Sequence, residues 1–112
     1  MRINDIINVI PNTLVTGKEL LQKEVRGGYC GDLLSRVMAK GPKDGLWITV
    51  QTHVNIIAVA VLLEISCIII PEDIPIEPNT IEKADEEGIV ILSSPLSAFE
   101  IAGRLHGMGM DG

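Results

Sequence analysis

The sequence predicts an α/β fold, a three-layer α/β/α sandwich built on a mostly parallel sheet. From Leu46 onward, strand and helix patterns alternate three times, which is typical of right-handed crossovers between parallel strands. Two of the strand segments, 68–70 and 89–92, are continuous aliphatic runs rather than alternating ones. Strands of this kind are buried on both faces, so helices must cover both sides of the sheet.

Composition restricts the size and the partners of the protein. The chain has 112 residues, of which 46% are hydrophobic and 21% charged, and this is enough for the core of one domain. We predict one domain over residues 1–106 and a flexible tail over 107–112, whose glycines and methionines have nothing to pack against. A net charge of −6 repels phosphate backbones and anionic lipid, so we expect neither nucleic-acid nor membrane binding. Two cysteines without a secretory leader favour a cytoplasmic location with free thiols.

The first forty residues hold short elements separated by glycine and proline. Isoleucines at helical spacing predict a helix over 2–10, which Pro11 ends. A short strand over 13–16 follows. Adjacent glycines within 25–34 indicate a strand whose backbone comes close to another group, or a bulge, and a short helix over 35–40 comes next.

The remaining chain supplies the alternating elements. The predicted strands cover 46–50, 67–70 and 89–92, and the predicted helices cover 54–65, 78–87 and 95–106. The apolar run over 54–70 is shorter than a bilayer span and contains Glu64, so it indicates a buried helix followed by a buried strand.

The helix over 54–65 is apolar around its whole circumference, so it must be buried on more than one side. The second side could be another helix of the same chain or the same helix of a second copy. Because an exposed apolar stripe usually marks an interaction site, we favour a homodimer. The predicted interface residues are Ile56, Val59, Ala60 and Leu63.

Polar segments follow three of the predicted parallel strands, beginning at Gln51, Pro71 and Ser93. Ligands of parallel α/β sheets bind outside the carboxyl ends of the strands, where helix N-termini also point. Hydroxyl, amide and imidazole groups beside free helix N–H groups favour a small anionic or nucleotide-like ligand. The predicted ligand-binding residues are Asp32, Gln51, Thr52, His53, Asn55, Ser93, Ser94 and Ser97.

Several of these residues also have a structural interpretation. Thr52 with Asn55, and Ser94 with Ser97, match patterns in which a hydroxyl group caps a helix. Asp32 could cap the helix that follows it, or it could reach across to the turn at Thr52. These residues therefore either bind a ligand or form hydrogen bonds with the backbone of their own chain.

The chemistry at His53 is open in the same way. A cation in the first turn of a helix opposes the helix dipole, so His53 is a ligand contact, a general base or a structural hydrogen-bond partner. An enzyme would use His53 with Asp32 and the turn at Ser93 and Ser94. However, the sequence contains no nucleophile elbow, no phosphate-binding glycine loop and no metal-ligand spacing, so we expect no catalytic residue, no metal and no cofactor.

The order of motifs resembles the DRTGG domain family over nearly the whole chain. The segments that carry this resemblance are Gly31-Asp-Leu-Leu34, Leu46-Trp-Ile-Thr-Val-Gln-Thr-His53, Asn55-Ile-Ile-Ala-Val-Ala60, Thr80-Ile-Glu-Lys-Ala84, Gly88-Ile89 and Ser94-Pro-Leu-Ser-Ala-Phe99. The family is similar in fold to the N-terminal domain of HPr kinase/phosphorylase, and its members accompany phosphotransacetylase domains and CBS-domain pyrophosphatases. The resemblance implies a regulatory or assembly module, commonly dimeric and without catalytic activity, that serves a larger enzyme or a sensor protein.

The chain lacks most of the Asp-Arg-Thr-Gly-Gly residues after which the family is named. Thr52 and His53 stand at the position of the Asp-Arg pair, and residues 71–73 replace Thr-Gly-Gly. The ligand of other members therefore need not be the ligand of this chain. We predict a regulatory module that binds a small ligand, with a small enzyme and a pure protein–protein scaffold as the alternatives.

Overall fold

The computed structural model describes residues 1–112 and contains one five-stranded sheet. The strands are β1 (Thr13–Thr16), β2 (Gly28–Cys30), β3 (Leu46–Ile48), β4 (Cys67–Ile70) and β5 (Val90–Ser93), arranged in the order β1-β5-β4-β3-β2. Neighbouring strands from β2 to β5 are parallel, and β1 pairs antiparallel with β5. The predicted mostly parallel sheet is confirmed.

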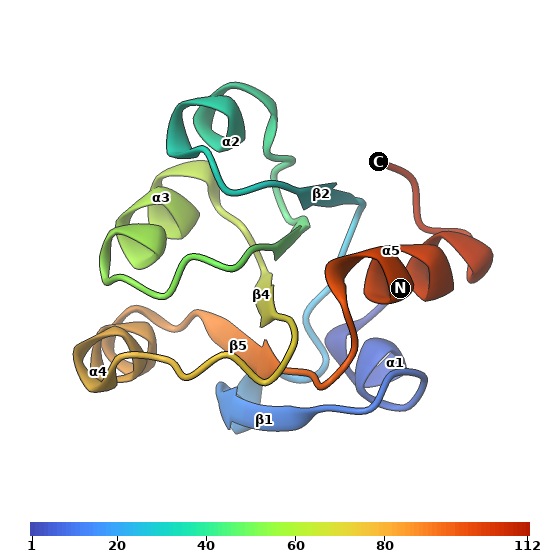
Figure 1. The fold of residues 1–112 in the computed structure, drawn as a ribbon, viewed down its shortest axis with the longest axis horizontal. Coiled ribbons are helices and arrows are strands. Elements are labelled where there is room, and N and C mark those ends of the chain that lie inside the picture. The colour runs from blue at the N-terminus through green and yellow to red at the C-terminus, as the bar shows by residue number, and fades with distance from the viewer.

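Helices cover both faces of this sheet (Figure 1). One face carries α2 (Leu34–Lys40), α3 (Asn55–Leu63) and α4 (Pro78–Glu87), and the other carries α1 (Ile3–Ile7) and α5 (Ala98–Gly107). A 3₁₀ turn, Lys18–Leu20, links β1 to the segment before β2. The three-layer sandwich is therefore confirmed. None of these helices has the length and apolar character needed to cross a bilayer.

The central strand β4 explains why the aliphatic runs are continuous. Its residues Cys67 and Ile69 pack against α1 and α5, whereas Ile68 and Ile70 pack against α2, α3 and α4. All four residues are fully buried. Burial of one isoleucine side chain contributes about 1.5–3 kcal/mol, so a polar residue at any of these positions would cost the fold heavily.

Helix α3 is not buried on all sides. Ile56, Val59 and Ala60 lie in the core of their own chain, and Leu63 is half-buried. The choice of Ile56, Val59 and Ala60 for an interface is thereby corrected, because the core of their own chain already occupies their side chains, whereas Leu63 stays a predicted interface residue. The apolar residues of α3 that face outward are Ala58, Val61 and Leu62.

The C-terminal residues pack against the rest of the chain. The side chain of Met110 is buried in the core on the α5 side of the sheet. The backbone N–H of Gly28 donates to the carbonyl of Asp111 at 2.9 Å, and His106 Nδ1 lies 3.2 Å from the carbonyl of Met110. The prediction that residues 107–112 have nothing to pack against is therefore wrong.

A side chain bridges β1 and β5 where their pairing shifts by one residue. The shift falls between Leu14 and Thr16. The Oγ1 of Thr16, which is buried, donates to the carbonyl of Ile89 at 2.8 Å and accepts from the N–H of Ile91 at 2.9 Å. A threonine hydroxyl thus replaces the backbone partners that the irregularity removes.

Candidate functional site

The carboxyl ends of the four parallel strands lie along one side of the sheet, which we call the carboxyl rim. It consists of the segments 31–33, 49–55, 71–73 and 94–97, which follow β2, β3, β4 and β5. Hydrogen bonds connect these segments. The N–H groups of Glu72 and Asp73 donate to the carbonyls of Leu96 and Ser94, both at 2.9 Å. The structure therefore brings the predicted polar segments together.

Asp32 crosses from the end of β2 to the end of β3. Its Oδ1 accepts from Thr49 Oγ1 at 2.9 Å and from the N–H of Val50 at 2.8 Å, while Gln51 Nε2 donates to the Asp32 carbonyl at 3.1 Å. The N-cap of α2 is Leu33, without a side-chain hydrogen bond. Asp32 therefore does not cap a helix, and it fixes the turn from Thr49 to Gln51 rather than the one at Thr52.

The turn between β3 and α3 is tied to the start of α4. His53 Nδ1 lies 2.9 Å from Glu77 Oε2, and Thr80 Oγ1 donates to the Thr52 carbonyl at 2.7 Å. His53 has a structural partner, yet its side chain remains 67% exposed. No side chain caps α3, so neither Thr52 nor Asn55 does so; the N–H groups of Ile56 and Ile57 in its first turn donate instead to the carbonyls of His53 and Val54, at 3.1 and 3.0 Å.

The serines after β5 have separate structural roles. Ser94 is fully buried, and its Oγ donates to the carbonyl of Pro11 at 2.7 Å and accepts from the N–H of Leu96 at 3.2 Å. Ser97, not Ser94, caps α5, because its Oγ accepts from the N–H of Glu100. Ser93 is the last residue of β5 and pairs with β1 and β4. The burial of Ser94 removes it from the solvent-facing part of the rim.

The charge of the carboxyl rim is acidic. Asp32, Glu72 and Asp73 are exposed, and Glu77 approaches His53. The positive group nearest in sequence is Arg36, in the first turn of α2. The N-termini of α3 and α5 favour an anion, whereas these carboxylates oppose one. A ligand of this rim must therefore bind through hydrogen bonds and apolar contacts as well as through charge.

Asp32, His53 and Ser94, which belong to the enzyme hypothesis, form no hydrogen bond with one another. Asp32 bonds to the end of β3, His53 to Glu77 and Ser94 to Pro11, so none of the three is hydrogen-bonded to either of the others. Nucleophilic catalysis needs a base within hydrogen-bond distance of its nucleophile. In addition, no cluster of three metal-ligating side chains is present.

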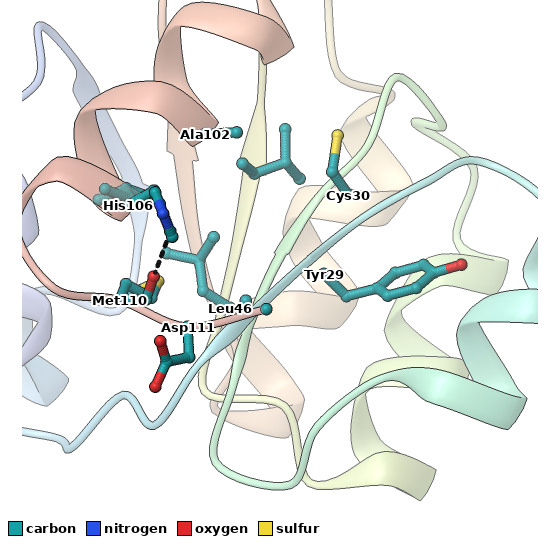
Figure 2. Close-up of a pocket in the computed structure, with 11 residues that line it drawn as sticks. Tyr29, Cys30, Leu46, Ala102, His106, Met110 and Asp111 are labelled. Atoms are coloured by element: carbon teal, nitrogen blue, oxygen red, sulfur yellow. Dashed lines mark hydrogen bonds between the residues drawn. The ribbon is translucent and has the colours of Figure 1, made fainter.

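A second site lies on the α5 side of the sheet, and the sequence did not reveal it. We call it the β2 cleft, a cavity of about 320 Å³ between α5 and the strands β2 and β3 (Figure 2). Its apolar wall is formed mainly by Cys30, Leu46, Ile48, Ala102, Leu105 and Met110. No lysine or arginine lines it. The only sequence signal was the run of glycines around β2, which marks a backbone that another group can approach.

The two thiols differ in environment. Burial raises the pKa of Cys67 to about 12, while at the β2 cleft partial burial and the charge of Asp32 raise the pKa of Cys30. Both cysteines are free thiols. At neutral pH each thiol is protonated and uncharged, so Cys30 adds no negative charge to the cleft.

Comparison with known proteins identifies the fold. No protein-family model matches the sequence, and no curated protein matches it. The structure is similar to the CBS and DRTGG domains of the regulatory region of Clostridium perfringens pyrophosphatase, solved in complex with its activator, diadenosine tetraphosphate. The TM-score is 0.72 and the identity 14%, over 93% of this chain and 45% of that one. The chain thus spans less than half of its structural relative, and at this identity the likeness shows the fold alone. The resemblance predicted from the sequence is confirmed at that level: the chain has a DRTGG-like α/β fold.

Proposed function

We propose that this chain is a non-catalytic regulatory or assembly module that binds a nucleotide-like ligand at its carboxyl rim and works as a homodimer. The observation that carries the proposal is the likeness in fold, over 93% of the chain, to a regulatory region that binds a nucleotide activator. The separate hydrogen-bond partners of Asp32, His53 and Ser94 support a binding role over a catalytic one. Two free thiols support a cytoplasmic location.

The ligand site that we propose is the turn between β3 and α3. His53 and Asn55 are exposed there, Thr52 is partly exposed, and the N-terminus of α3 lacks a side-chain cap. The hydrogen bonds that Asp32 accepts from Thr49 and Val50 hold the residues just before this turn, which lowers the entropy cost of ordering it on binding. Because the rim is acidic, the base and ribose contribute to affinity along with the phosphates, and inorganic phosphate alone does not bind.

Calorimetry and thermal unfolding test this site with diadenosine tetraphosphate, ATP, adenosine and inorganic phosphate. A ligand at 100 times its dissociation constant stabilises the fold by about 2.7 kcal/mol, which is a large rise in Tm for a domain of this size. His53→Ala is expected to weaken nucleotide binding about tenfold. His106→Ala is the matched control, because His106 lies at the opposite end of α5 from the rim. If none of the nucleotides binds, or if both variants bind equally well, the proposed site is refuted.

The proposed homodimer uses the outward face of α3. Val61 is 42% and Leu62 67% exposed, and they line a groove of about 330 Å³ against α4. Lys83 and Glu87 of α4 complete its wall and supply both signs of charge, as a self-complementary surface requires. Sedimentation velocity is expected to show a dimer that Leu62→Ser converts to a monomer. Phe99→Ser, which removes a more exposed side chain elsewhere, should leave the dimer intact. A monomeric parent protein at micromolar concentration would contradict the proposal.

A module of this kind serves a larger protein. The structural relative is part of the regulatory region of an enzyme, and this chain corresponds to 45% of it. We therefore propose a larger enzyme or a sensor protein as the partner. If the chain dimerises and binds its partner but no nucleotide, the scaffold alternative holds instead.

A further inference from the structure

The outer edge of β2 offers unpaired backbone groups. β2 is the last strand of the sheet. The Gly27 carbonyl accepts from the N–H of Leu46 at 2.8 Å, and the N–H of Gly31 donates to the Ile48 carbonyl at 3.1 Å. Because backbone groups alternate in direction along a strand, those of Gly28 and Cys30 point away from β3. An edge of this kind is a template on which another extended segment can pair.

The chain itself occupies the beginning of this edge. The N–H of Gly28 donates to the Asp111 carbonyl, and Met110 places its side chain against the same face of the sheet. Gly28 allows this approach, since a Cβ there would lie 3.3 Å from Met110 Sδ. The C-terminal residues thus show which contacts fit here: a backbone carbonyl that accepts from the β2 edge and an apolar side chain turned toward α5. The N–H and carbonyl of Cys30 have no such partner.

The β2 cleft continues from Met110 along the unpaired part of the edge. Cys30 and Ala102 stand at its far end, while Met110, held by His106, stands at the near end (Figure 2). The cavity of about 320 Å³ has room for a large apolar side chain beyond Met110. Asp111 is the acidic residue that lines the cleft, and no lysine or arginine lines it.

We propose that the β2 edge and the β2 cleft together bind an extended segment of a partner protein by strand addition. The segment forms backbone hydrogen bonds with Cys30, places a leucine- or methionine-like side chain in the cleft and carries a basic residue near Asp111. A second copy of this chain does not fit, because its own β2 presents Gly28 and Cys30 on this face, and these side chains are too small to fill the cavity. The site is independent of the nucleotide site proposed above, since it lies on the α5 face of the sheet.

The experiment uses a short capped peptide in which leucine and threonine alternate and a lysine stands at each end. Binding to the ¹⁵N-labelled protein is followed by NMR, with expected shifts at Cys30, Ile48 and Ala102 and slower hydrogen exchange at the Cys30 amide. A peptide with serine in place of leucine tests the cleft. Cys30→Pro removes the outward N–H without touching the bonds to β3, and Cys30→Ala is the matched control that keeps it. Ala102→Phe fills the cleft and supplies a second test if Cys30→Pro fails to fold.

Loss of one backbone hydrogen bond is expected to weaken peptide binding about tenfold in Cys30→Pro, and Cys30→Ala should bind like the parent protein. The serine peptide and the Ala102→Phe variant should show at least the same loss. Equal binding of the leucine and serine peptides would overturn the role of the cleft. Equal binding by the parent protein and Cys30→Pro, or shifts confined to the carboxyl rim, would overturn strand addition. Peptide-induced dimerisation would show that a second copy is the occupant, which also overturns the proposal.

Discussion

Thr16→Val tests whether the hydroxyl that bridges β1 and β5 stabilises the fold. Valine has nearly the same shape as threonine, so the substitution leaves packing almost unchanged but deprives the Ile89 carbonyl and the Ile91 N–H of their partner. Each unsatisfied buried group costs about 1–3 kcal/mol, and the added methyl group returns about 0.8 kcal/mol. The net loss in the free energy of unfolding for the two groups is therefore about 1–5 kcal/mol. With an unfolding entropy of about 0.24 kcal/mol/K for a chain of this length, Tm falls by about 5–22 °C.

Urea unfolding followed by tryptophan fluorescence measures this loss, because Trp47 is fully buried and is the only tryptophan. Thr13→Val is the matched control, since Thr13 lies exposed on the same strand and should change stability by less than about 0.5 kcal/mol. Thr16→Ser keeps the hydroxyl and should retain most of the stability. A loss below about 1 kcal/mol in Thr16→Val, at an unchanged m-value, would show that the hydroxyl does not replace the missing backbone partners.

Three further predictions concern the cysteines and glycines. Burial raises the pKa of Cys67 from 9.0 to about 12, so the unfolded state loses the thiol proton at a lower pH than the folded state does. The free energy of unfolding therefore falls by up to about 4 kcal/mol as the pH rises from 9 to 12. Urea titrations of Cys67→Ala should show a shallower pH dependence. Gly17→Ala should lower the free energy of unfolding by more than about 2 kcal/mol, because φ is +88° and the new Cβ would lie 2.5 Å from a β5 side chain. Gly88→Ala has φ +69° but open space around the new Cβ, so it should cost about 1 kcal/mol in the same assay. Asp32→Asn keeps the hydrogen-bond acceptor but removes the charge that helps raise the pKa of Cys30, so alkylation of Cys30 should become faster at a given pH; an unchanged rate would contradict this.

The sequence predicted the architecture because the strongest patterns are local ones. The aliphatic runs at β4 and β5 have no polar alternation, and only strands covered on both faces leave this pattern. Helix boundaries were less predictable. Ser94 and Ser97 are the same residue type in the same loop. The hydroxyl of Ser94 donates to the distant Pro11 carbonyl, whereas that of Ser97 caps α5. Such long-range contacts are invisible in a local pattern.

The candidate site was predictable in position but not in detail. Parallel strands bring their carboxyl ends together, so the convergence of the polar segments followed from topology. The partners of single side chains did not follow, because Asp32 and His53 are held by groups from other elements. Met110 was missed because one methionine between Gly109 and Asp111 shows no periodicity, and its burial depends on the space left between β2 and α5.

Both ends of the chain are fastened to one short stretch before and within β2. The N–H of Val25 donates to the Met1 carbonyl at 2.7 Å, and the N–H of Gly28, three residues later, donates to the Asp111 carbonyl. Polypeptide joined at either end therefore departs from neighbouring points on the surface. This geometry suits insertion of the domain into a loop of a host protein, because the two ends of the interrupted loop stay close together.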